Sequence, residues 1–198
     1  MRKEKNIKIA SVKNTSSSYT LSYCTCPKNK MRQYIDILDG YKVKVATLLN
    51  CFHPIIFAKI KEGDTVIDLG CGDGRDCFTA SAITGKTGRI IGIDNSSNMI
   101  ETARDNAKKL KLTNVEFIKG NIEHIPLEAN LADVVISNHA IVMVRNKQAV
   151  YKEIYRILKP NRYISIEDSV ILKDFTVKNQ SATEMYYDSV PGAEYCLM

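Results

Sequence analysis

The sequence predicts an α/β fold, with a doubly wound, mainly parallel sheet and helices on both of its faces. Short apolar segments with strand character alternate with segments whose apolar residues recur at helical spacing, which is the pattern of βαβ units. Segments such as RIIGI and VVIS are apolar without alternation, as expected of strands that are covered on both faces.

The expected elements follow one another from residue 65. We expect strands at 65–69, 89–93, 115–119, 132–137 and 162–167, and helices at 75–84, 96–110 and 146–158. Ser96 or Ser97 can cap the second helix, whose inner face is expected to carry Met99, Ile100, Ala103 and Ala107. The third helix is expected to end before a turn, Lys159-Pro160-Asn161, in which Asn161 can take the left-handed conformation.

The remaining segments have weaker patterns. Residues 1–20 are polar and lack periodicity, so we expect a flexible arm. Residues 21–60 are expected to form a helical N-terminal extension, with helices at about 29–39 and 42–50. The main domain then spans residues 61–198, in which VILKDF is interpreted as a loop after the fifth strand.

Composition excludes several classes of function. A chain of 198 residues with 44% hydrophobic and 25% charged residues is typical of one soluble globular domain. The net charge of +6 comes from scattered lysines, so we expect no nucleic-acid partner. No apolar run has the length of a signal peptide or a membrane span, which predicts a cytoplasmic protein with no membrane partner. In that compartment the cysteines are expected to be free thiols, namely Cys24, Cys26, Cys51, Cys71, Cys77 and Cys196.

The stretch from Thr65 to Asp94 has the features of a nucleoside-binding site. An apolar strand leads into a turn with Gly70, Gly72 and Gly74, and a helix and a second strand follow. Glycines let a ligand approach the backbone closely, and the helix start offers free N–H groups. Asp94, at the end of the second strand, can accept hydrogen bonds from a ribose diol. A plain tight turn, and a helix cap at Asp94, remain as alternatives.

The form of this turn favours one class of ligand. Dinucleotide sites prefer GxGxxG, whereas this chain has GxGxG preceded by Asp68 on the strand. A carboxylate there would repel a pyrophosphate but suits a cationic or zwitterionic ligand. This favours S-adenosylmethionine (SAM), which carries an amine and a sulfonium and no phosphate.

Four segments resemble class I SAM-dependent methyltransferases. DLGCGDG resembles their first motif, GIDNSSNM their acidic second-strand motif, FIKGNIEHIP the segment that borders the adenine, and ILKPNRYISIED the turn into strand five. The resemblance implies a Rossmann-like domain with SAM as cofactor. By position it assigns the methionine end of SAM to Asp68 and the three glycines, and the ribose to Asp94. It assigns the rest of the nucleoside site to Asn95, Met99, Ile122, Glu123 and Asn138.

A narrower resemblance is to arsenite methyltransferases. DLGCGDGRDCF is similar to their GRDC signature, and AEYCLM to GECLGG. GNIEHIP, VVISNHAIVMV, TLSYCTCPKNKMRQYI and NCFHPI are similar to further segments of that family. The resemblance implies that Cys77 and Cys196 bind trivalent arsenic as substrate, since arsenic is soft and thiophilic. It also implies that Cys51, with Cys24 or Cys26, captures or resolves the thiol-bound substrate, with a thiol reductant such as glutathione or thioredoxin.

Two positions depart from this family pattern. His139 stands where the family has a third arsenic-binding cysteine, and imidazole is only a borderline ligand. The chain ends just past Cys196, in what looks like an unfinished helix, so the terminal antiparallel strands of the methyltransferase sheet are expected to be missing.

Alternatives to arsenic methylation remain open. Cys77 can be a core residue, although its place at a helix start is expected to lower its pKa and favour the thiolate. A methyltransferase for another small acceptor would use His139 as a base or positioning group. A non-catalytic thiol or metalloid binder is the third hypothesis. Arsenic use predicts that Cys77 and Cys196 approach one another, whereas a general methyltransferase predicts that they lie apart or buried.

Overall fold

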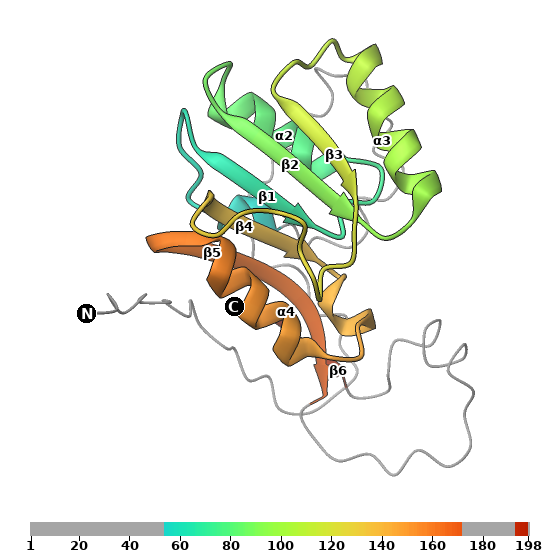
Figure 1. Ribbon diagram of the computed structural model, residues 1–198, viewed down its shortest axis with the longest axis vertical. Helices are drawn as coiled ribbons and strands as arrows, with labels where there is room; N and C mark the ends of the chain where they lie inside the picture. The colour runs from blue at the N-terminus through green and yellow to red at the C-terminus, as the bar shows by residue number, and fades with distance from the viewer. Residues whose placement is uncertain (1–53, 172–192, 198) are drawn as a thin grey trace.

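The computed structural model describes residues 54–171 and 193–197 (Figure 1). The expected arm and helices before residue 54 lie outside the described residues. The strands are β1 (Thr65–Leu69), β2 (Arg89–Asp94), β3 (Val115–Lys119), β4 (Ala132–Asn138), β5 (Leu158–Ile171) and β6 (Ala193–Leu197). The helices are α2 (Arg75–Thr84), α3 (Ser97–Lys109) and α4 (Lys147–Ile157), with short 3₁₀ turns η1 (Pro54–Ile56) and η2 (Ile141–Met143).

The strands form one sheet in the order β3-β2-β1-β4-β5-β6. The first five strands are parallel, and α2 and α3 cover the face opposite to α4 (Figure 1). Successive residues of β1 show why its run is apolar without alternation. Val66 packs beneath α2 and α3, whereas Ile67 packs beneath α4. The predicted doubly wound sheet with helices on both faces is confirmed.

The chain reverses its direction of travel across the sheet at β1. From β1 the chain moves outward through β2 and β3, and it then returns to place β4 on the other side of β1. In open α/β sheets, ligands bind at such a switch point, outside the carboxyl ends of the strands. The fold therefore directs attention to the residues that follow β1 and β4.

Helix α3 begins as the sequence predicts, but one residue of its inner face was wrongly assigned. Ser96 is the N-cap, and its hydroxyl accepts a hydrogen bond from the Met99 N–H at 3.4 Å. Ile100, Ala103 and Ala107 are buried, whereas the Met99 side chain is 46% exposed. Met99 lies in the first turn of α3, where the side chain is not covered by the core.

The C-terminal part of the sheet corrects two expectations. β5 begins at Leu158 and runs to Ile171, so it includes the expected turn and the start of VILKDF. Asn161 has the expected positive φ, 61°, and a register shift in the pairing of β4 with β5 accommodates the irregular start. The expectation that the chain ends in an unfinished helix without antiparallel strands is wrong, because Ala193–Leu197 form β6, which pairs with β5 in antiparallel orientation. Pairing at the sheet edge creates this strand, and five residues are too few for periodicity to reveal it.

Candidate functional site

The glycine-rich turn after β1 is held against β2 by its backbone. The N–H groups of Gly70 and Cys71 both donate to the Ile93 carbonyl, at 2.8 and 3.1 Å. A Cβ on Gly70 would collide with the Ala140 side chain, so the close approach of two loops requires glycine there. Gly72 has a φ of +52° and no atom within 4 Å of its Cβ position, so its backbone faces open space that a ligand can occupy.

Asp94 links this turn to the end of β2. One carboxylate oxygen accepts from the Gly72 N–H at 2.9 Å, and the other accepts from the Ser96 N–H at 2.8 Å. Each carboxylate oxygen has a second lone pair, so the group can still accept hydrogen bonds from a ribose diol. Two backbone contacts hold the carboxylate in place at the open side of Gly72.

The segment after β3 lies beside the same end of β2, because the Gly120 N–H donates to the Asp94 carbonyl at 3.0 Å. Ile122 in this segment is 7% exposed, whereas Asn95 is an exposed residue. Glu123 accepts a hydrogen bond of 2.7 Å from the Asn146 N–H at the start of α4. This bond is the main cause of a lowered Glu123 pKa, and it ties the segment to α4.

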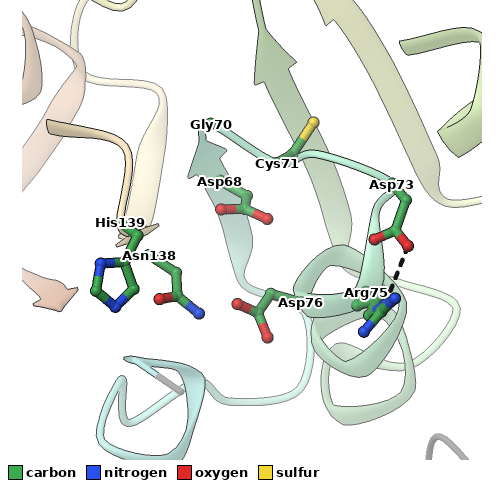
Figure 2. Close-up of a pocket in the computed structure, with 8 residues that line it drawn as sticks. All are labelled: Asp68, Gly70, Cys71, Asp73, Arg75, Asp76, Asn138 and His139. Carbon is green, nitrogen blue, oxygen red and sulfur yellow. Dashed lines mark hydrogen bonds and ion pairs between the residues drawn. The ribbon is translucent and has the colours of Figure 1, made fainter. Parts of the chain in front are cut away.

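A pocket of about 300 Å³ opens at the carboxyl ends of β1 and β4 (Figure 2). Its lining comes from the glycine-rich turn, the start of α2 and the end of β4, namely Asp68, Gly70, Cys71, Asp73, Arg75, Asp76, Asn138 and His139. Figure 2 shows the side chains of Asp68, Asp76 and Asn138 directed toward a common space, while the sulfur of Cys71 points away from it. The pocket thus brings together four residues that the sequence singled out: Asp68, Gly70, Asn138 and His139.

Cys77 lies behind this pocket in the first turn of α2. Its thiol is completely buried and donates to Asp68 Oδ2 at 3.3 Å. Burial is the main cause of a thiol pKa well above its ordinary value, and the nearby thiol of Cys71 and carboxylate of Asp68 add to it. The expectation that the helix start lowers this pKa is therefore wrong, since burial beside an acid outweighs the helix dipole.

Asp68 is a buried acid as well, at 2% exposure. Burial and the charge of Asp76 raise its pKa well above the ordinary value, against the opposing hydrogen bond from Cys77. A buried carboxyl of this kind is suited to a ligand that carries positive charge, because such a ligand favours the ionised form.

The sequence did not single out Glu167, which lies on β5 next to the pocket. Glu167 is completely buried, and among the described residues neither of its carboxyl oxygens has a hydrogen-bond partner. Its backbone carbonyl accepts from the N–H of His139 at 2.9 Å. Burial is the first cause of a pKa of about 8, followed by the charges of Asp76 and Asp168. An acid inside the apolar strand ISIED was the available signal.

The cysteines assigned to arsenic lie on different elements. Cys196 is in β6, where its backbone pairs with Asp168. β6 is three strands away from β1, roughly 14 Å at normal strand spacing, whereas α2 with Cys77 packs over β1 and β2. Cys24, Cys26 and Cys51 lie outside the described residues. Within the described part of the chain, no three His, Cys, Asp or Glu side chains are grouped to hold a metal ion.

The geometry fits SAM. The site offers an open glycine backbone, a fixed carboxylate at the end of β2 and a buried acid at the end of β1. A family model described as a methyltransferase domain matches residues 60–195. The chain belongs to the methyltransferase-domain family.

This methyltransferase domain is similar to curated relatives with different acceptors. It is 39% identical over 145 residues to an arsenite methyltransferase of Halobacterium salinarum, which covers 73% of this chain and 37% of the relative. It is 32% identical over 142 residues to a sterol 24-C-methyltransferase of Pneumocystis carinii, covering 69% of this chain and 37% of the relative. The chain thus spans little more than a third of the length of these relatives.

Solved structures give the same family. An arsenic(III) SAM methyltransferase from Chlamydomonas reinhardtii matches with a TM-score of 0.67 and 29% identity, over 83% of this chain and 56% of that one. A SAM-dependent methyltransferase from Aquifex aeolicus matches with a TM-score of 0.54 and 25% identity, over 77% and 78% of the two chains. The class I methyltransferase fold, the resemblance to arsenite methyltransferases and SAM as the cofactor of this domain are confirmed. In the described residues, no helix of this methyltransferase domain is long and apolar enough to cross a membrane.

Proposed function

We propose that this chain transfers the methyl group of SAM to trivalent arsenic, as arsenite or methylarsenite. The position of Cys77 carries this proposal. Its thiol lies directly behind the glycine-rich turn and 3.3 Å from Asp68, a residue of the pocket. The similarity to arsenite methyltransferases in sequence and in structure supports the same acceptor.

The residues of this chain would contribute mainly by holding the reactants. SAM, when bound, supplies an electrophilic methyl group, and the lone pair of trivalent arsenic is the nucleophile, so no general base is needed. Asp68 and the backbone of Gly70, Gly72 and Gly74 would hold the methionine end, and Asp94 the ribose. Transfer is then accelerated by positioning the acceptor in line with the methyl group.

Arsenic capture requires the Cys77 thiol to lose its proton. Burial keeps this thiol protonated, so its proton has to leave with the hydroxyl group that is displaced from arsenic. Formation of one As–S bond then consumes one S–H and one As–OH group and releases one water. Cys196 would supply a second thiolate, and Cys51 with Cys24 or Cys26 would deliver the substrate. Methyl transfer to the lone pair raises arsenic from +3 to +5, and a thiol reductant such as glutathione or thioredoxin in the cytoplasm would supply the two electrons that return arsenic to +3 and release the protein thiols.

A second candidate function is methylation of another small acceptor. Complete burial of Cys77 favours it, because a buried thiol needs local opening before it can bind arsenic. The placement of Cys196 on β6, three strands from β1, favours it as well, because arsenic use predicts that the two thiols approach one another. Similarity to a sterol methyltransferase and to a demethylmenaquinone methyltransferase of Lactococcus lactis, 38% identical over 108 residues, favours it as well. His139, in the lining of the pocket, would then position or deprotonate the acceptor.

Product analysis separates these functions. The purified full chain is incubated with SAM, reduced glutathione and either arsenite or methylarsenite, and the arsenic species are separated. We expect a methylated product that Cys77→Ser abolishes. Cys71→Ser is the matched control, since that thiol is also buried but belongs to the glycine-rich turn, with its sulfur directed away from Asp68. No methylated arsenic from either substrate refutes the proposal, and arsenite binding without product indicates a non-catalytic relative. A larger amount of methylated arsenic from His139→Cys than from the wild type would show that the missing thiolate limits the reaction.

A further inference from the structure

Three polar side chains occupy corresponding positions at the carboxyl ends of adjacent strands. Asp68 is the last residue of β1 whose side chain is on the face covered by α2. Asn138 is the last such residue of β4, two residues after Ile136, which belongs to the core beneath α2. Asn138 pairs in register with Glu167 of β5, so these two side chains also share a face. Ser165, two residues before Glu167, confirms this face, because its hydroxyl donates to the Pro54 carbonyl of η1.

Glu167 differs from the other buried acids of this face in its hydrogen bonding. Asp68 accepts from a thiol, whereas neither oxygen of Glu167 has a partner among the described residues. Leaving a buried polar group unpaired is costly, and most buried groups in native proteins are paired. Glu167 lies behind the pocket lining, in register with Asn138, and is completely buried, so a ligand reaches its carboxyl only after local opening at this position. An unpaired carboxyl in this place indicates a position that a ligand completes.

The groups around Glu167 restrict the charge of that ligand. Asp76 faces it from the start of α2, Asp168 follows it on β5, and His139 contacts it through its backbone N–H. Burial and the two acids raise the Glu167 pKa to about 8, so at neutral pH the group has one O–H donor and one free acceptor oxygen. Asp68 and Asp76 line the same pocket, so an anionic acceptor would be repelled.

We propose that Glu167, beside Asn138, is the acceptor-binding group of this pocket and hydrogen-bonds a hydroxyl group of a neutral acceptor. The inference rests on the proposed function, and it specifies the form of the substrate. Arsenous acid is neutral at pH 7 and carries three hydroxyl groups that can both donate and accept. Glu167 would bind a hydroxyl on arsenic while the thiols bind the arsenic atom, so it determines specificity without taking part in methyl transfer.

Calorimetry on the full chain tests this role. Arsenite is titrated at pH 7 in the presence of S-adenosylhomocysteine, into wild type, Glu167→Gln and Glu167→Ala. We expect Gln, which keeps a donor and an acceptor, to retain arsenite affinity within about threefold. Ala is expected to weaken it about tenfold or more. Affinity for S-adenosylhomocysteine is expected to stay within about twofold in every variant, because Glu167 is assigned to the acceptor. Glu116→Ala, a half-exposed strand position on β3, is the matched control.

The outcomes separate this inference from the proposed function. Equal arsenite affinity and equal methylation rates in wild type and Glu167→Ala overturn the role of Glu167 and leave arsenic methylation standing. No arsenite binding by the wild type overturns both, since the proposed acceptor is then absent. If Glu167→Ala does not fold, Glu167→Leu and Glu167→Gln provide the comparison, and equal affinity in these two overturns the inference.

Discussion

Replacement of Glu167 by Gln is expected to change how the stability of the fold depends on pH. The carboxyl has a pKa of about 8 in the folded state, against an ordinary value of 4.5. Between these two values the folded state holds a proton that the unfolded state has released. The folded state therefore binds more protons, and the free energy of unfolding falls as the pH rises through this window. Below 4.5 both states are protonated, and the effect vanishes.

The size of the effect follows from the shift. One pKa unit corresponds to 1.36 kcal/mol, so the penalty reaches about 3 kcal/mol at pH 7 and about 5 kcal/mol above pH 8. Glu167 is completely buried, so solvent screening does not reduce this figure greatly. Gln cannot ionise, and the variant should lose the penalty. The unfolding free energy of Glu167→Gln minus that of the wild type is thus expected to rise by about 3 kcal/mol between pH 4.5 and pH 7.

Urea denaturation followed by circular dichroism measures this difference at several pH values from 4.5 to 8. The subtraction removes the other titrating groups, which both proteins share. Glu116→Gln controls for the chemical change itself, because its ion pair with Arg89 is half exposed and contributes at most about 1 kcal/mol. Parallel stability curves for the wild type and Glu167→Gln would refute the reasoning, since Glu167 would then be ionised in the folded protein.

Two further substitutions test the cofactor site and the amino ends of the strands. Asp94→Asn keeps the shape of the side chain but removes the charge that holds the Gly72 N–H. We therefore expect the dissociation constant of SAM, measured by calorimetry, to rise about tenfold. An unchanged constant contradicts the assignment. Burial opposes ionisation of Asp133, but the hydrogen bond of 2.7 Å from Lys159 contributes to a pKa below the ordinary value. Asp133→Asn should lower the free energy of unfolding, measured by urea denaturation, by about 1–3 kcal/mol at pH 7. This difference from the wild type should shrink as the pH falls through the Asp133 pKa. A difference that persists unchanged at pH 2 contradicts this account.

The parts of the fold that the sequence predicts are those that local chemistry decides. The first four strands are short segments rich in Val, Ile and Phe, and Ser96 caps a helix with its own hydroxyl. The parts that it did not predict depend on pairing. β5 starts at Leu158 because β4 lies beside it across a register shift, and β6 exists because β5 offers an edge.

The same distinction applies to the site. The sequence singles out the glycines and Asp94 because they lie on consecutive elements within thirty residues. The pKa of Cys77 was wrongly predicted, because a helix start is visible in the sequence and complete burial beside Asp68 is not. Glu167 was missed for a related reason, since its unpaired state depends on neighbours from α2 and β4.

Buried acids at the two ends of the strands differ in their hydrogen bonding, and this difference supports a functional role for Glu167. Asp133, near the amino end of β4, is 4% exposed and is paired with Lys159, Arg162 and the Thr65 N–H. Glu167, at the carboxyl edge of the neighbouring strand, is more deeply buried and has no hydrogen-bond partner for its carboxyl among the described residues. A buried acid that stabilises the fold therefore has hydrogen-bond and ion-pair partners in this chain. An acid that weakens the fold at the ligand-binding edge is explained if a bound acceptor supplies the missing hydrogen bonds.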